Sequence, residues 1–246
     1  MSAVLLGLVA GFLSGHFGLG GGLITTPGIR LIGYGAYFAI GTPLLANIPT
    51  ALSGAWTYGR HGHVDWPLAA RLGIPGGLGA IIGSLFTNIV NPHVILLTTA
   101  VVIGFLSFRF FPAAQSRSGH LPLAAAAPKP LVGLAIGIAS GFLGLGGGFL
   151  LIPYLSLSLG KDIKTVFGTS LAAILFITLP GALVHWLLGH VDLSLAGAII
   201  VGVVPGAIAG ARVAIAMPEK VLRVGFAVLL LALAFYLGYS ELALLA

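Results

Sequence analysis

Two nine-residue runs rich in glycine, Ser14–Gly22 and Ser140–Gly148, hold the residues whose types and spacing point most clearly to chemistry. Each run contains five glycines, and each glycine disfavours helix by about 1 kcal/mol relative to alanine. The runs interrupt two apolar stretches of about 30 residues, Ser2–Tyr34 and Leu131–Gly160. We therefore expect each stretch to form two half-helices around an unwound centre.

A helix that begins directly after such a run favours an anion. Half-helices that start at Leu23 and Phe149 have N–H groups without acceptors and direct the positive end of the helix dipole toward the centre. Glycine also lets a ligand approach the main chain closely. Two such ends aimed at one place would form an anion site. The alternative is that glycine only permits close helix packing, which we prefer for the isolated Gly73, Gly77 and Gly137.

Few side chains could join this site. His16 lies inside the first run, where the second run has Phe142. A histidine at the middle of a membrane could donate to an anion or carry a proton, or it could be packed and neutral. Hydroxyls in membrane helices usually bond the carbonyl four residues earlier, whereas Asn47 stands between two prolines. The candidate substrate-binding residues are His16, Gly18, Gly20, Gly21, Gly22, Thr42, Asn47, Gly144, Gly146, Gly147, Gly148, Thr169 and Ser170.

The carboxylates fall at expected helix ends or in loops, although proton- or cation-coupled carriers often place one within the membrane. Asp65 precedes Trp66-Pro67 and Asp192 precedes Leu193-Ser194, so we expect both to cap the helices that follow. His61 and His63 are expected to be solvated loop histidines rather than a metal pair. We predict no metal site and no cofactor.

The composition determines the class of protein. Of the 246 residues, 58% are apolar and 7% are charged, against about 25% charged in an ordinary soluble domain. So few charges cannot solvate the surface of a soluble fold, so the chain is an integral membrane protein whose main solvent is lipid. The net charge of +6 then belongs to loops rather than to a nucleic-acid interface. The chain has no cysteine, which excludes disulfides and thiolate chemistry.

The sequence predicts an all-α membrane fold. A helix needs about 20 apolar residues to cross the hydrocarbon core, and no period-two alternation suggests a β-barrel. The hydrophilic interval near 113–130, which contains several prolines, is expected to be a linker between a first repeat over 1–112 and a second over 131–246. The predicted full spans are Gly35–Tyr58, Pro67–Asn88, His93–Phe111, Ile163–Leu188, Leu193–Ala216 and Val221–Leu242.

The two halves repeat one another. The glycine runs match at an offset of 126, and Gly62-His63-Val64-Asp65 matches Gly189-His190-Val191-Asp192 at an offset of 127. Gly41-Thr42 likewise matches Gly168-Thr169. An ordered series of Gly, His and Asp is difficult to attribute to chance similarity between apolar helices.

Loop charge indicates how the halves are oriented. If the broken segments cross the membrane, the Lys and Arg residues divide five to six between its two sides; if they dip in and return, ten lie on one side and only Arg30 on the other. Loops rich in Lys and Arg stay cytoplasmic. We therefore predict two inverted repeats, each a re-entrant hairpin followed by three transmembrane helices, in the cell membrane with both termini outside.

Enzyme motifs are absent from the sequence. The glycine runs lack the Gly-x-Gly-x-x-Gly spacing of nucleotide loops and follow no strand. No His-Glu-x-x-His occurs, nor the Gly-x-Ser-Gly of an intramembrane serine protease. We expect the protein not to be an enzyme.

The paired Ser-Gly-x-x-Gly-Leu-Gly-Gly-Gly runs, the Gly-Thr pairs and the Gly-His-Val-Asp turns resemble the sulfite exporter TauE/SafE family of membrane proteins. This resemblance covers nearly the whole chain and implies transport of sulfite or organosulfonates across the bacterial cytoplasmic membrane. It also implies that the glycines of 18–22 and 144–148, with Thr42 and Thr169, line the path. The family often has an apolar residue at the position of His16.

The function expected from these features is secondary transport, in the direction of export, of a small sulfur-containing anion by alternating access between the halves. A passive anion or solute channel of the same architecture is the alternative, and a membrane scaffold that transports nothing is a third. The expected partners are the anion and the lipid bilayer, with no nucleic acid. The sequence leaves the oligomeric state open, a homodimer included.

Overall fold

The structure is a computed structural model that describes residues 2–110 and 127–245, and within these ranges every regular element is helical. Residues 113–126 of the predicted linker lie outside the described residues. The elements are α1 (Ser2–Phe17), α2 (Gly22–Leu31), α3 (Ala36–Gly59), α4 (Trp66–Thr87), α5 (Pro92–Phe110), α8 (Lys129–Leu143), α9 (Gly148–Pro153), the short π-helix η1 (Tyr154–Ser158), α10 (Ile163–Leu187), α11 (Leu193–Ala216) and α12 (Glu219–Leu245).

Each predicted span coincides with one helix, to within three residues at either end. Four helices of the described chain are long and apolar enough to cross a membrane: α4, α10, α11 and the part of α12 over Glu219–Tyr239. The helices α3 and α5, with 24 and 19 residues, occupy the other two predicted spans. α8 begins at Lys129, two residues before the predicted start of the second repeat.

The helix breaks at both glycine runs, as the glycine content predicts. α1 ends at Phe17 and α2 begins at Gly22, and α8 ends at Leu143 and α9 begins at Gly148. The breaks depend on backbone angles that residues with a Cβ rarely adopt. Positive φ angles of 70° to 85° occur at Gly18, Gly20, Gly144, Gly146 and Gly147.

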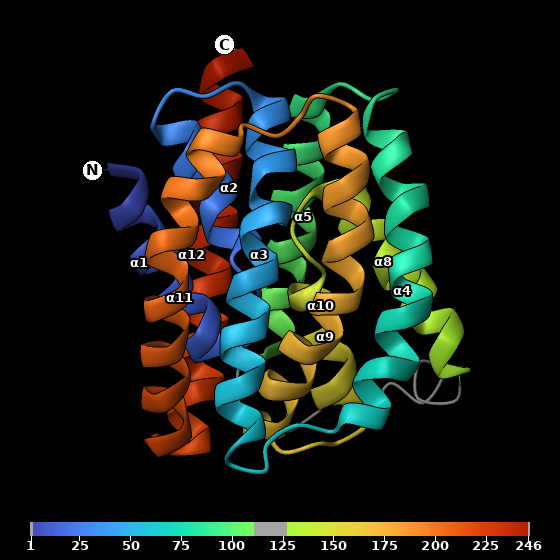
Figure 1. Cartoon of the computed structure of the whole chain (residues 1–246), viewed down its shortest axis with the longest axis vertical. Helices are drawn as coiled ribbons and strands as arrows, with labels where there is room; N and C mark the ends of the chain where they lie inside the picture. Colours follow the sequence, from blue (N-terminus) through green and yellow to red (C-terminus); the bar gives the residue numbers. More distant parts are fainter. Residues whose placement is uncertain (1, 111–126, 246) are drawn as a thin grey trace.

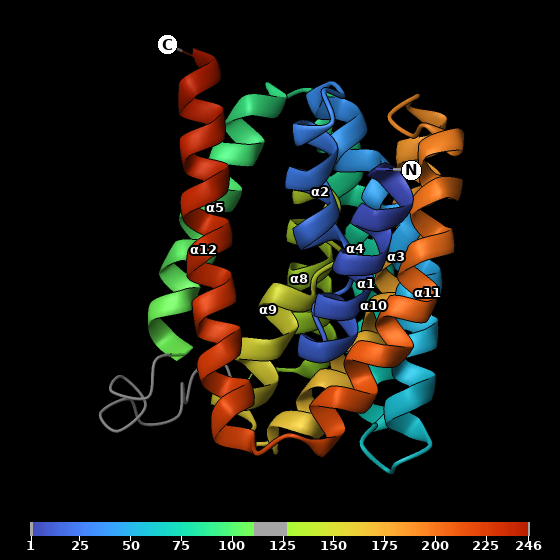
Figure 2. The same cartoon turned by 90° about the vertical axis from the view of Figure 1, so that its left-hand side faces the viewer.

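The two broken segments run in opposite senses. In Figures 1 and 2, α1 descends from the N-terminus toward the interior and α2 returns upward, whereas α8 rises from the lower end and α9 returns downward. The long helices surround these segments and run close to the vertical axis of both views. Consequently, the two glycine loops enter the interior from opposite ends.

Glycine faces bring three helix pairs into backbone contact. α1 packs on α11, and α4 packs on both α8 and α10. A Cβ atom at Gly137 of α8 would lie 2.6 Å from the carbonyl carbon of Gly76, and one at Gly77 of α4 would lie 2.6 Å from the carbonyl oxygen of Phe176. At Gly73 it would lie 2.8 Å from the carbonyl oxygen of Ala173. The predicted packing role of these isolated glycines is confirmed.

We expect Gly137→Val to destabilise the protein by about 3 kcal/mol or more, because overpacking costs 1–3 kcal/mol even where side chains can move and here the obstacle is backbone. Gly197→Val on α11 is the matched control, since a Cβ there meets nothing within 4 Å. Thermal unfolding in detergent measures both. Equal melting temperatures for the two variants would contradict this account of the packing.

Candidate functional site

The two glycine loops contact each other in the interior. A Cβ at Gly22 would lie 2.9 Å from the carbonyl oxygen of Leu145, and one at Gly148 would lie 2.8 Å from the Cα of Leu19. These contacts are related by the repeat offset of 126. Both leucines are completely buried. Gly22 and Gly148 are therefore required because the opposite loop approaches so closely, and the loops form one central structure.

Asn47 of α3 lies against both loops. A Cβ at Gly21 would lie 3.0 Å from its Oδ1, and one at Gly20 would lie 3.8 Å from its Cγ. A Cβ at Gly146 in the opposite loop would approach its Nδ2 even more closely than either of these distances. The side chain is 0% exposed, and neither its oxygen nor its nitrogen has a hydrogen-bond partner.

The backbone beside Asn47 also has unpaired donors. Within the described ranges, no backbone hydrogen bond is donated by an N–H of residues 20–23 or 146–149. No side chain caps α2 or α9 either. Buried N–H groups are almost always paired in proteins. An unpaired carboxamide and two sets of unpaired N–H groups thus lie together in the interior.

The two halves of the repeat place chemically different side chains against the glycine loops. At the offset of 127, the residue that corresponds to Asn47 is Ile174. Ile174 faces Gly20 in the same way as Asn47 faces Gly146. Its Cδ1 would lie 3.2 Å from a Cβ at Gly20. One half thus contributes an amide and the other a methyl group. A site at the centre is polar toward α3 and apolar toward α10.

Hydroxyl groups near the loops divide into two kinds. Thr25, Thr50 and Thr178 donate to the carbonyl four residues earlier, at 2.7–2.9 Å, as membrane helices usually allow. Other buried hydroxyls have no partner, and Ser140 among them would lie 3.3 Å from a Cβ at Gly147. These unpartnered hydroxyls are on Ser14, Thr26, Ser140, Ser158, Ser170 and Tyr154.

The ring of His16 contacts neighbours other than Asn47. It stacks on Phe12 with ring centroids 5.8 Å apart and meets Phe17 edge-on at 4.5 Å, while its Nδ1 is buried without a hydrogen-bond partner. The hydroxyl of Tyr58 donates to its carbonyl at 3.3 Å. These contacts match the packed alternative for His16 better than a place in the central site.

The hydroxyls of Thr42 and Thr169 accept hydrogen bonds from the starts of helices. The hydroxyl of Thr169 accepts from the N–H of Asp65 at 3.0 Å, and that of Thr42 accepts from the N–H of Asp192 at 3.1 Å. Both aspartates cap the next helix: Oδ1 of Asp65 accepts from the N–H of Leu68 at 3.1 Å, and Oδ1 of Asp192 caps α11 in the same way. The predicted caps are confirmed.

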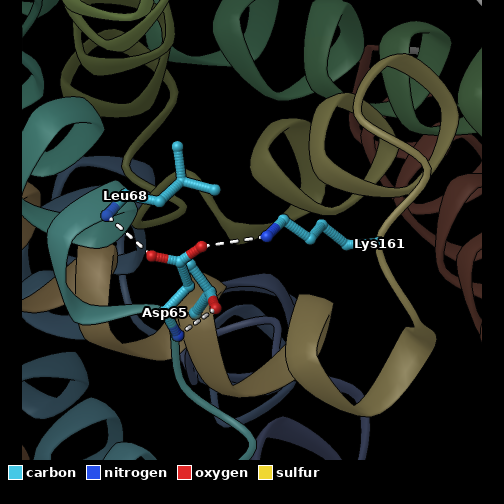
Figure 3. Close-up of polar contacts among 4 residues, drawn as sticks. Asp65, Leu68 and Lys161 are labelled. Carbon is cyan, nitrogen blue, oxygen red and sulfur yellow. Dashed lines mark hydrogen bonds and ion pairs between the residues drawn. The ribbon is translucent and has the colours of Figure 1, made fainter.

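Asp65 has one additional partner. Figure 3 shows its carboxylate between Leu68 and Lys161, with Nζ of Lys161 3.0 Å from Oδ2. Burial alone would raise the pKa of Asp65, but the hydrogen bonds from Lys161 and Leu68 and the charges of Lys161 and Arg71 lower it. The pair joins the start of α4 to the segment before α10. Because it is partly exposed, it adds at most about 1 kcal/mol of stability.

A buried pair of histidines was missed by the sequence analysis. Nδ1 of His185 and Nδ1 of His190 lie 3.2 Å apart, and Nε2 of His185 lies 3.1 Å from the carbonyl oxygen of Gly141. Because that carbonyl only accepts, Nε2 of His185 carries a proton, and a neutral His185 then accepts from His190 at Nδ1. Tyr37 stacks on His190 at 4.6 Å. The only available signal was the repeat, which places His190 opposite His63.

We expect thermal stability in detergent to fall as the pH drops below about 6.5. Burial lowers the pKa of His190 from its ordinary 6.5, so below that pH the unfolded chain binds more protons than the folded one. His190→Asn keeps a donor but cannot titrate, and we expect a smaller fall between pH 7.5 and 5.5. His61→Asn, at an exposed position, should retain the full fall. Identical pH slopes for wild type and His190→Asn would contradict the assignment.

These features define the class of protein. Apolar helices long enough to span a bilayer, arranged around a buried polar centre, are those of a multi-pass membrane protein. Among the described residues there is no group of three or more His, Cys, Asp or Glu that could hold a metal ion.

The chain belongs to the sulfite exporter TauE/SafE family of membrane transporters, whose family model matches residues 3–237. It is 28% identical to the probable membrane transporter protein YunE of Bacillus subtilis (strain 168), over 88% of each chain. It is 29% identical to a probable membrane transporter protein of Xylella fastidiosa (strain 9a5c), over 96% of this chain and 94% of that one. No solved structure is significantly similar to it.

Proposed function

We propose that the protein is a secondary transporter that exports a small sulfur-containing anion, such as sulfite or an organosulfonate, across the cell membrane. The observation that carries this proposal is the unpaired carboxamide of Asn47 between two glycine loops whose N–H groups are also unpaired. The family name supplies the sulfur chemistry. The family does not determine the individual substrate.

An anion suits this centre because unpaired N–H donors lie there. The N–H groups at the start of α2 and the amide of Asn47 can donate to oxyanion oxygens, and such charge-assisted bonds are about twice as strong as neutral ones. The methyl groups of Ile174 on the opposite side give the centre an apolar surface suited to an apolar or sulfur-bearing part of the ligand. Without an ion these donors are left unpaired, which costs about 1–3 kcal/mol each.

Burial of the site and the internal repeat support alternating access. The residues of the centre are all buried, namely Gly20, Gly21, Gly146 and Asn47. A ligand therefore reaches them only after part of the protein moves. We propose that the halves are inverted repeats, that each broken segment is a re-entrant hairpin, and that the halves rock about the loops. A channel of the same architecture is the second candidate: saturable counterflow in proteoliposomes distinguishes the carrier from unsaturated flux through a pore.

We expect Asn47→Ile, which copies Ile174, to weaken sulfite binding to purified protein about tenfold to hundredfold, because a hydrogen bond to a charged group contributes about 1.5–3 kcal/mol. His16→Phe, which copies Phe142 of the second run, is the matched control and should change the affinity less than twofold. Titration calorimetry with sulfite, sulfate, taurine and sulfoacetate measures both.

The reverse order of effects, with His16→Phe abolishing binding and Asn47→Ile leaving it intact, would contradict the proposed site. A thermal-unfolding curve for each variant without ligand separates lost binding from lost folding. Binding of cations alone would remove the anion proposal altogether.

The proposed topology predicts opposite labelling of two single cysteines. Because the chain contains no cysteine, Ile32→Cys and Gly160→Cys can each be tested alone with a membrane-impermeant thiol reagent in intact cells. Both positions are exposed. The inverted, re-entrant arrangement with both termini outside predicts that the cysteine at 32 reacts from outside and that at 160 only from the cytoplasm. Labelling of both from one side would contradict the re-entrant hairpins.

A further inference from the structure

A continuous groove runs along the contact between α3 and α11. Its inner part is a cavity of about 380 Å³ lined by apolar side chains and Ser53. Pro49, Leu52 and Trp56 repeat at helical spacing on α3, and Val204 and Ile208 are one turn apart on α11. Leu52 and Trp56 are 58% and 63% exposed, so this groove opens to the surroundings of the protein.

The groove continues into a polar cavity of about 530 Å³. Trp56 and Ile208 line both cavities, and the second adds Arg60, His61 and Arg212. Nδ1 of His61 lies 2.9 Å from the carbonyl oxygen of Thr57. Within the described residues, neither the guanidinium of Arg60 nor that of Arg212 forms an ion pair or a hydrogen bond with the protein. Two unpaired guanidinium groups therefore lie at the end of an apolar groove.

Among the described residues, the corresponding positions of the other half do not repeat this combination. Arg60 corresponds to Leu187 at the offset of 127. Arg212 corresponds to Ile82 at the offset of 130, which also relates Pro75-Gly76 to Pro205-Gly206. An apolar cavity of about 400 Å³ between α3 and α10, which includes Trp186, has no cation in its lining. The arginines are thus a particular feature of the α3–α11 groove.

We propose that this groove binds an anionic phospholipid, with an acyl chain along Leu52 and Val204 and the phosphate on Arg60 and Arg212. Charge complementarity favours this occupant: arginine forks bind phosphate, and basic pockets between membrane helices bind anionic headgroups. From Pro49 to Arg60 the helix rises about 16 Å, close to half of a hydrocarbon core of about 30 Å. Trp56 then lies where acyl chain meets headgroup, the depth at which tryptophan is enriched.

This proposal requires only that the protein spans a membrane, and it is independent of the transported anion. The groove lies on the outer face of α3 and α11, whereas Asn47 is buried between the glycine loops. Failure of the lipid site therefore leaves the proposed transport site untouched, and the reverse is also true.

Native mass spectrometry of the purified protein tests the site. With mixed micelles containing equal phosphatidylglycerol and phosphatidylcholine, we expect the wild type to retain phosphatidylglycerol preferentially. The double variant Arg60→Gln/Arg212→Gln should bind it about thirtyfold more weakly, since each arginine contributes about 1 kcal/mol near an anionic headgroup. Arg71→Gln, also an exposed arginine, is the control for charge alone and should bind as the wild type does.

Two further measurements distinguish a phospholipid from free phosphate and separate a lost lipid site from misfolding. Val204→Trp, which fills the groove and leaves both arginines, should also lose phosphatidylglycerol. Inorganic phosphate or glycerol phosphate should not raise the melting temperature of the wild type at concentrations where phosphatidylglycerol does. Equal retention of the two lipids by the wild type, full retention by the double variant, or equal protection by inorganic phosphate would overturn the lipid proposal.

Discussion

The structure depends on one constraint: main-chain N–H groups deep inside a membrane protein must find an acceptor. The chain breaks its helix twice at depth, and it can do so only because unwound backbone there is enclosed by protein. Glycine supplies the left-handed angles at Gly18 and Gly144 and the absence of Cβ atoms that lets Gly22 and Gly148 meet the opposite loop. The N–H groups that remain unpaired define the centre at which we propose an anion.

The helices around the loops hold them in place by backbone contact more than by side-chain bulk. α1 lies on α11 and α4 lies on α8 through faces of glycine. The matched contacts of the two halves would make both loops chemically alike. Asn47 opposite Ile174 removes that equality, and it gives the centre a polar and an apolar side.

The sequence was sufficient to predict the helices, the two breaks and the aspartate caps, because hydropathy, glycine density and cap chemistry are local properties. It was not sufficient for contacts between distant residues. Thr42 and Thr169 accept bonds from helix starts at Asp192 and Asp65, and the pairing of His185 with His190 depends on how a loop folds back. His16 illustrates the same difficulty, since the sequence gives its depth but not the neighbour that its ring faces.

The proposed anion site is tested most directly by an experimental density map, at side-chain resolution, of the protein in lipid nanodiscs with saturating sulfite. We expect a compact peak between the glycine loops, about 3 Å from Nδ2 of Asn47 and from the N–H groups of Gly20 and Gly21. A map in which these donors bond to the protein itself, with sulfite bound elsewhere, would contradict the proposed site.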